Sequence, residues 1–134
     1  MNKLIIYTDG GARGNPGPAG IGAAIYNEKK ELISEVSEYL GETTNNQAEY
    51  RAVIAAFKKA AELKAEEIDF FLDSELVVRQ LNRQYKVKNK DLAPLFLIIH
   101  NTVLSYKKVT FTHIRREENK YADMLANRAM DQAG

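Results

Sequence analysis

The chain has 134 residues, 45% of them hydrophobic and 28% charged, which suits a single globular domain with one core. With 19 basic and 18 acidic residues the net charge is +1, so any site for a polyanion must be local. The absence of cysteine excludes disulfides, thiolate zinc sites and thiol catalysis, and no apolar run suits a signal peptide or a membrane span. We therefore expect a cytoplasmic enzyme or binding module, organised as one domain over residues 1–134.

The N-terminal stretch KLIIYTDGGARGNPG joins an apolar strand to a glycine-rich turn. Strand alternation places Ile5, Tyr7 and Asp9 on one face, which predicts a strand that ends in a carboxylate. A desolvated carboxylate is costly unless water, a cation or a hydrogen-bond donor accompanies it. The alternative is that Asp9 only initiates its own turn, and these residues alone do not separate the two interpretations.

The next elements are two strands joined by a short polar turn and then a long helix. Residues 20–26 and 31–39 are predicted to extend the first strand into an antiparallel meander. Residues 44–64 change to helical periodicity, and Thr44 and Gln47 have the spacing of a capping box. The stripe predicted to face the sheet comprises Glu49, Val53, Ala56 and Ala60. Glu49 therefore lies in the first turn, where an acid stabilised by the helix dipole is the simpler explanation.

A fourth strand over residues 67–73 also ends in an aspartate, Asp73, and a helix follows from Ser74. A strand that arrives after a helical crossover should run parallel to the first strand. If the two strands are neighbours, Asp9 and Asp73 meet at the carboxyl edge, where open α/β sheets place their sites. A helix N-cap is the alternative role for Asp73 and is compatible with this one.

The C-terminal third begins with a short basic connection over residues 84–90. The cations in or near it are Arg79, Arg83, Lys86, Lys88 and Lys90. A solvated face is the favoured interpretation of this run over contact with nucleic acid. A helix over residues 91–106 follows, with Asp91 as its cap and Pro94 in its first turn.

A fifth strand is predicted over residues 109–114 and a last helix over 120–130. The apolar stripe of that helix comprises Ala122, Leu125, Ala126 and Ala129. Asp123 borders this stripe at the start of the helix.

Four acids thus stand at strand ends or in first helical turns: Asp9, Glu49, Asp73 and Asp123. If the fold gathers them at one edge, they repel and raise one another's pKa values, and a hard divalent cation relieves that conflict. Two Mg²⁺ ions about 4 Å apart can activate a water and stabilise a leaving oxygen. The pattern therefore favours phosphodiester hydrolysis.

Four ordered blocks, each with one of these acids, carry a family resemblance over nearly the whole chain. They are YTDGGARGNPGPAGIG, TTNNQAEYRA, FLDSELVVRQLN and HIRREENKYADMLAN. The chain resembles a ribonuclease H domain of type 1. The resemblance implies an α/β fold, with a mixed five-stranded sheet of order 3-2-1-4-5 flanked by helices.

The resemblance also implies residue roles. Asp9, Glu49, Asp73 and Asp123 would be the catalytic carboxylates that bind two Mg²⁺ ions, with Mn²⁺ as a possible substitute. The positions that match nucleic-acid contacts are Asn15, Asn46 and Gln47 for RNA 2′-hydroxyls, Thr44 with Asn15 for a DNA phosphate, and Asn119 near the catalytic loop. Polar side chains suit the 2′-hydroxyl, although turns and helix caps favour the same residue types.

The chain departs from some family members in two places. Its 84–91 connection is short and it contains no tryptophan, which resembles a compact subgroup without a basic protrusion. His113 has a suitable separation from Asp123 for an auxiliary catalytic histidine. However, it shares a strand face with Val109 and Phe111, which favours a packed structural histidine, with Glu117 or Glu118 as partial replacements.

The resulting hypothesis is a monomeric endoribonuclease that cleaves the RNA strand of RNA/DNA hybrids and leaves a 3′-hydroxyl and a 5′-phosphate. One alternative keeps the fold and metals but acts on RNA–DNA junctions or double-stranded RNA. Another is a non-catalytic hybrid-binding module, which would be expected to lack a carboxylate. A fragment of a larger polymerase-linked protein is a further alternative.

Overall fold

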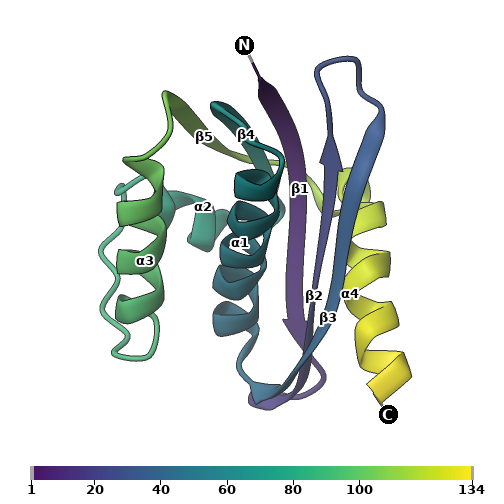
Figure 1. Cartoon of the computed structure of the whole chain (residues 1–134). Helices are drawn as coiled ribbons and strands as arrows, with labels where there is room; N and C mark the ends of the chain where they lie inside the picture. The colour runs from purple at the N-terminus through teal and green to yellow at the C-terminus, as the bar shows by residue number, and fades with distance from the viewer. Residues whose placement is uncertain (1, 134) are drawn as a thin grey trace.

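The computed structural model describes residues 2–133, which form one sheet with helices on both faces (Figure 1). The strand order is β3-β2-β1-β4-β5, as predicted. The strands are β1 (Lys3–Ala12), β2 (Gly17–Tyr26), β3 (Leu32–Thr43), β4 (Glu67–Leu72) and β5 (Lys108–His113). The helices are α1 (Asn45–Glu62), α2 (Glu75–Leu81), α3 (Ala93–Val103) and α4 (Lys120–Ala133), with a 3-10 turn η1 (Arg116–Glu118) before α4.

The central strand β1 pairs antiparallel with β2 and parallel with β4. Because β1 and β4 are parallel neighbours, their carboxyl ends lie at the same edge of the sheet, as the sequence predicted. Helices α1 and α3 lie on one face, and α4 lies on the other, over β2 and β3 (Figure 1). This arrangement brings the start of α1 and the start of α4 to that edge from opposite sides.

Helix α1 contributes the predicted stripe to the core. Val53, Ala56 and Ala60 are fully buried, and Glu49 on the same face is 7% exposed. The stripe continues into aromatic packing, because Phe57 of α1 meets Phe70 of β4 edge-on, with ring centroids 4.8 Å apart. This packing fixes the height of α1 above the sheet and so the position of Glu49.

Two glycines allow the helices to approach the sheet backbone closely. A Cβ atom on Gly10 would lie 2.3 Å from the carbonyl oxygen of Ala48 in α1. A Cβ atom on Gly22 would lie 2.3 Å from the carbonyl oxygen of Ala122 in α4. Neither distance is possible for a real Cβ, so glycine is needed at both positions to seat the helices that carry Glu49 and Asp123.

The prediction that the first strand ends at Asp9 is wrong. β1 continues through Gly10, Gly11 and Ala12, which stay paired with β2, so Asp9 lies inside a strand. The third strand likewise extends beyond its predicted end, to Thr43. In both cases pairing with β2 continues through glycines that local propensity assigns to turns.

The predicted cap Asp91 is wrong, and the alternative cap role of Asp73 is not observed. Ser74, not Asp73, caps α2, since its hydroxyl accepts a 3.3 Å hydrogen bond from the Val77 amide. Helix α3 begins at Ala93 rather than Asp91, because the Asn89 side chain accepts from the Asp91 amide and forms a separate turn. Thr44 caps α1 as predicted, by accepting a 3.2 Å hydrogen bond from the Gln47 amide.

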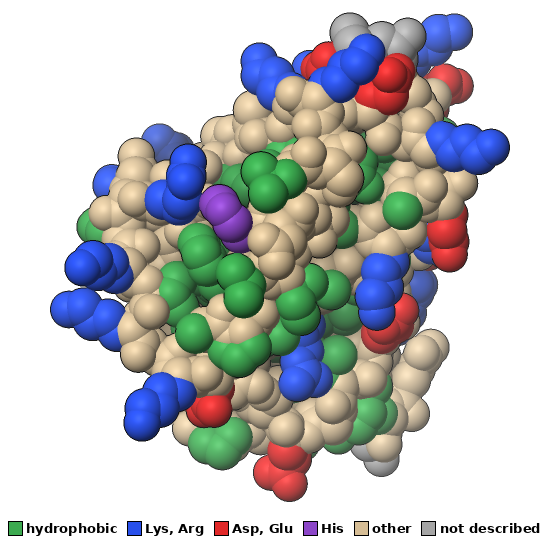
Figure 2. All heavy atoms as spheres, turned by 60° about the vertical axis from the view of Figure 1, so that its left-hand side comes forward, with side chains coloured by type: hydrophobic (Ala, Val, Ile, Leu, Met, Phe, Trp, Pro, Cys, Tyr) green, Lys and Arg blue, Asp and Glu red, His purple; other side chains and the backbone are tan. Residues whose placement is uncertain are grey.

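The face that carries α3 is unusually apolar for a surface. Leu97, Ile98 and Leu104 are each about half exposed or more, at 55%, 48% and 73%. Figure 2 shows hydrophobic side chains gathered on this face, with Lys and Arg side chains along its margin. Across residues 2–133, every helix is too short or too polar to traverse a lipid bilayer.

We expect Gly22→Ala to destabilise the protein by about 1–3 kcal/mol, because the new methyl group must push α4 away from β2. Urea denaturation followed by circular dichroism measures this change. Gly11→Ala is the matched control, since its Cβ would meet nothing nearer than an Asn45 oxygen at 3.8 Å. Equal effects of the two substitutions would contradict the close-approach explanation.

Candidate metal-dependent active site

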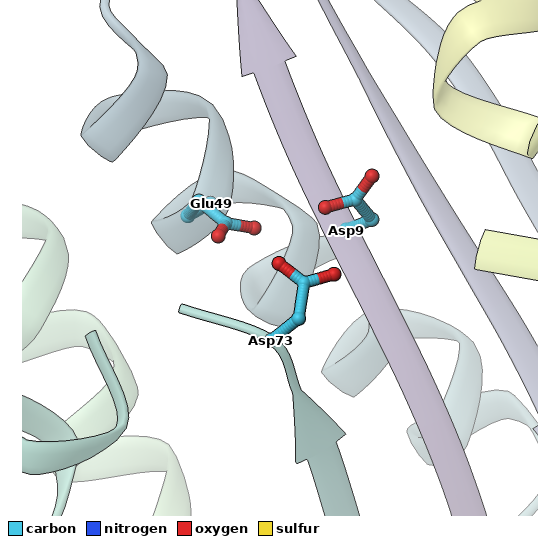
Figure 3. Close-up of side chains that lie close together, drawn as sticks. All are labelled: Asp9, Glu49 and Asp73. Atoms are coloured by element: carbon cyan, nitrogen blue, oxygen red, sulfur yellow. The ribbon is translucent and has the colours of Figure 1, made fainter. Parts of the chain in front are cut away.

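Three carboxylates from distant parts of the chain converge at the carboxyl edge of β1 and β4. Asp9 comes from β1 and Asp73 from the residue after β4. Glu49 comes from the second turn of α1, not the first as predicted, because the helix begins at Asn45. One oxygen from each lies within 4.8 Å of the others, and Figure 3 shows the three side chains pointing toward one another. The structure therefore brings together three of the four predicted acids as a possible metal site.

The fourth acid, Asp123, borders the same site from the first turn of α4. It lines, together with the other three, a hollow of about 370 Å³ at this edge. Its carboxyl group is close enough to Asp9 to raise the pKa of that residue. Asp123 thus stands beside Asp9, although it is outside the tight cluster of three.

Burial and mutual repulsion disfavour the charged forms of two of these acids. Asp9 is 9% exposed, and its desolvation, followed by the charges of Asp73 and Asp123, raises its pKa to about 8. Desolvation and then the charges of Asp9 and Asp73 raise the pKa of Glu49 well above its ordinary value. Two groups oppose the shift at Glu49: the Gly10 amide, which donates a 2.9 Å hydrogen bond to Oε1, and Arg116.

The donor set fits a hard divalent cation. All the groups are carboxylate oxygens, the ligand type that Mg²⁺ and Mn²⁺ prefer. A bound cation would also relieve the repulsion that raises the pKa values of Asp9 and Glu49. Asp9, Glu49 and Asp73 are the residues placed to hold such an ion, with Asp123 beside them.

Four of the five residues predicted to contact nucleic acid, all except Asn119, lie around one end of this hollow. Asn46 lines it, and Thr44 caps α1 next to it. Asn15 Oδ1 accepts a 3.0 Å hydrogen bond from the Asn45 amide, and Gln47 Oε1 accepts a 2.7 Å bond from Thr43. Within the part of the chain that the structure describes, no hydrogen bond uses the amide NH₂ groups of Asn15, Asn46 or Gln47.

Asn119, the fifth residue predicted to contact nucleic acid, is buried inside the protein. It is 1% exposed, and its Nδ2 donates hydrogen bonds to the Thr8 carbonyl, at 2.9 Å, and to Asp73 Oδ2, at 2.8 Å. The side chain is therefore committed inside the protein, behind the carboxylates.

The sequence interpretation missed Arg116 and misplaced His113. Arg116 lines the acidic hollow and its charge acts on Glu49. The one local signal was its position in a polar run shortly before Asp123. His113, at the end of β5 beside Leu72, is exposed, so the prediction of a packed histidine is wrong, and it does not line the hollow. Strand alternation misled here because the face shared with Val109 and Phe111, which are half-buried, becomes exposed at the last residue of β5.

Comparison with known proteins agrees with this geometry. A family model described as reverse transcriptase-like matches residues 7–129. A ribonuclease H of Ruthia magnifica is 36% identical over 151 aligned positions, which cover 98% of this chain and 97% of the relative. The chain belongs to the ribonuclease H family.

Other members of the ribonuclease H family match over nearly the whole of this chain. The bifunctional protein Rv2228c of Mycobacterium tuberculosis is 41% identical over 98% of this chain, but the match covers only 36% of that protein. The chain thus spans about a third of the length of the curated relatives it matches first. The structure of LC11-RNase H1, isolated from compost by a metagenomic approach, superposes with a TM-score of 0.93 at 48% identity, covering 99% of both chains. A second structure shows LC11-RNase H1 in complex with an RNA/DNA hybrid. Its protein chain superposes on this chain with a TM-score of 0.92 at 46% identity, covering 97% of this chain and 98% of that one.

We expect Asp9→Asn to stabilise the metal-free protein at neutral pH by on the order of 2 kcal/mol. The folded state raises the pKa of Asp9 from 3.8 to about 8, so between these values it holds a proton that the unfolded chain has released. The stability of the wild type should therefore fall as pH rises through this window, and the asparagine variant should fall less. Thermal unfolding with a chelator at pH 5 and pH 8 measures both. A variant less stable than the wild type at pH 8 would contradict the repulsion described above.

Proposed function

We propose that this ribonuclease H domain hydrolyses the RNA strand of RNA/DNA hybrids, with two divalent ions bound at Asp9, Glu49, Asp73 and Asp123. The observation that carries the proposal is the convergence of Asp9, Glu49 and Asp73 oxygens within 4.8 Å. The hybrid bound by LC11-RNase H1, a protein of nearly identical fold, supports the substrate. We further propose Mg²⁺ as the ion, Mn²⁺ as a substitute, and a monomer as the active form.

The roles of the chain's own residues follow from their placement. Asp9 in β1 and Asp73 directly after the neighbouring parallel strand β4 would hold both ions. Glu49 and Asp123 would each complete one site from opposite faces of the sheet. When bound, two such ions supply an activated water and stabilisation of the departing 3′-oxygen. The rigid sheet edge fixes the carboxylates before substrate arrives, so little reorganisation is needed during the reaction.

Recognition of the RNA strand is assigned to the polar residues at the N-terminus of α1 and the preceding turn. The NH₂ groups of Asn15, Asn46 and Gln47 are donors without partners in residues 2–133, while the Asn15 and Gln47 oxygens are fixed by hydrogen bonds. A fixed amide with available N–H groups suits a 2′-hydroxyl, which accepts as well as donates. This contact distinguishes RNA from DNA without reading sequence.

The direct test is cleavage of labelled RNA/DNA hybrid, double-stranded RNA, an RNA–DNA junction and single-stranded RNA, each with Mg²⁺, Mn²⁺ or chelator. We expect hybrid cleavage that needs a divalent ion and leaves 5′-phosphate ends. Asp73→Asn should lower turnover by about 100-fold or more, because it removes an ionic ligand.

Binding of the hybrid without cleavage would indicate a non-catalytic module. Faster cleavage of the junction or of double-stranded RNA than of the hybrid would reassign the substrate. The intact set of four carboxylates favours the catalytic outcome.

A second test compares two basic side chains near the end of β5, Arg116 and His113. Arg116→Ala should lower turnover about 10-fold, because a cation beside the acidic hollow is lost. His113→Ala should stay within about twofold of the wild type, since the histidine does not line the hollow. Steady-state kinetics on the hybrid gives both values, and circular dichroism checks folding. A larger loss of turnover in His113→Ala than in Arg116→Ala would indicate that His113 is the auxiliary catalytic residue.

A further inference from the structure

Asn119 contacts three of the four acidic segments at once. Its side-chain nitrogen donates to the carbonyl of Thr8, the residue before Asp9, and to the carboxylate of Asp73. Its backbone carbonyl accepts a 3.1 Å hydrogen bond from the Asp123 amide. One buried residue therefore links β1, the end of β4 and the first turn of α4.

An ordinary structural role explains only part of this arrangement. A residue that precedes a helix commonly uses its side-chain oxygen to accept from the helix amides. The Asn119 side-chain oxygen does not do this, because Oδ1 is buried without a hydrogen-bond partner. Leaving a buried acceptor unpaired costs about 1–3 kcal/mol. The two hydrogen bonds donated by the N–H groups therefore determine the orientation of the side chain, and the oxygen does not.

The chemistry of the two acceptors restricts which residue can stand here. A single nitrogen must donate in two directions, to a backbone carbonyl and to a carboxylate, at the reach of a short side chain. An amide meets this need, whereas serine has one donor and an ionised aspartate has none. The hydrogen bond to Asp73 occupies Oδ2, and no hydrogen bond to Asp73 Oδ1 is found among residues 2–133. The aspartate is therefore held in one orientation with an oxygen left for an ion.

We infer that Asn119 is a positioning residue, which sets the orientation of Asp73 and its spacing from Asp9 and Asp123 and so determines the affinity of the site for divalent ions. The inference rests on the proposed function for the identity of the ligand, a divalent cation. It replaces the prediction that Asn119 contacts nucleic acid. Partners that orient metal ligands typically change metal affinity or activity by 10–100-fold when removed.

The test is Asn119→Asp, which keeps the shape of the side chain and removes both donors. Calorimetric titration of the protein with Mn²⁺, without nucleic acid, should show affinity at least about 10-fold weaker than in the wild type. With hybrid, kcat at fixed Mn²⁺ should fall and recover in part as Mn²⁺ is raised, while KM for the hybrid stays within about threefold. Asn82→Asp is the matched control, because its Nδ2 also donates to a backbone carbonyl, that of Phe111, away from the site.

Unchanged Mn²⁺ affinity in Asn119→Asp would overturn the inference, as would a raised KM for the hybrid with an unchanged metal requirement. A wild type that binds Mn²⁺ but cleaves no hybrid would instead overturn the proposed function alone.

If Asn119→Asp does not fold, an NMR titration of the wild-type protein still tests the inference. The side-chain NH₂ signals of Asn119 in nitrogen-15 NMR should exchange slowly with solvent and shift on Mg²⁺ addition, with the same midpoint as the Asp9 and Asp73 amides. The Asn82 NH₂ signals should not shift. Asn119 NH₂ signals that do not shift on Mg²⁺ addition would overturn the inference.

Discussion

Repulsion between carboxylates that the fold forces together is the constraint on which the site depends. Asp9, Glu49 and Asp73 would separate in a free chain, because the charge of Asp73 raises the pKa of Asp9 and the charges of both aspartates raise the pKa of Glu49. The core opposes this separation. The stripe of α1 and the aromatic contact of Phe57 with Phe70 anchor Glu49, and parallel pairing of β1 with β4 anchors the two aspartates. Stability gained by burying apolar surface thus holds together an unfavourable charge arrangement, which a bound cation would compensate.

Close packing of α1 and α4 on the backbone of the sheet determines where the carboxylates lie. Helix α1 can bring Glu49 over the sheet edge only because Gly10 lacks a side chain, and the Gly10 amide then donates to that same glutamate. In the same way, the missing side chain of Gly22 allows α4 to approach the sheet and bring Asp123 to its edge. Asp9 lies directly opposite Gly22 in the β1–β2 register, so the two helices converge on the strand segment that carries the central acid. The glycines that look like turn residues in the sequence are therefore packing residues inside strands.

The sequence predicted the parts of this arrangement that follow from periodicity and chain connectivity. Helical spacing placed Glu49 with Val53, Ala56 and Ala60, and the crossover through α1 placed Asp73 parallel to Asp9. Sequence reasoning failed where a distant segment decides the outcome. Pairing with β2 keeps Asp9 inside a strand, His113 is exposed where β5 ends, and the donors of Asn119 serve acceptors that lie 46 and 111 positions away. Arg116 was missed for the same reason, since only the folded chain places it against Glu49.

Under the proposed function, the acidic hollow would repel the phosphates of the substrate, so attraction would have to come from other parts of the surface. The connection after α2 meets this requirement. No ion pair within residues 2–133 involves Arg83, Lys86, Lys88 or Lys90, whereas Arg79 is bound to Glu75. These four exposed cations follow the helix whose N-terminus adjoins Asp73, and neutralising phosphates with them would release counterions and favour binding. Attraction and cleavage would then be carried by separate groups, which would reconcile a net charge of only +1 with a polyanionic substrate.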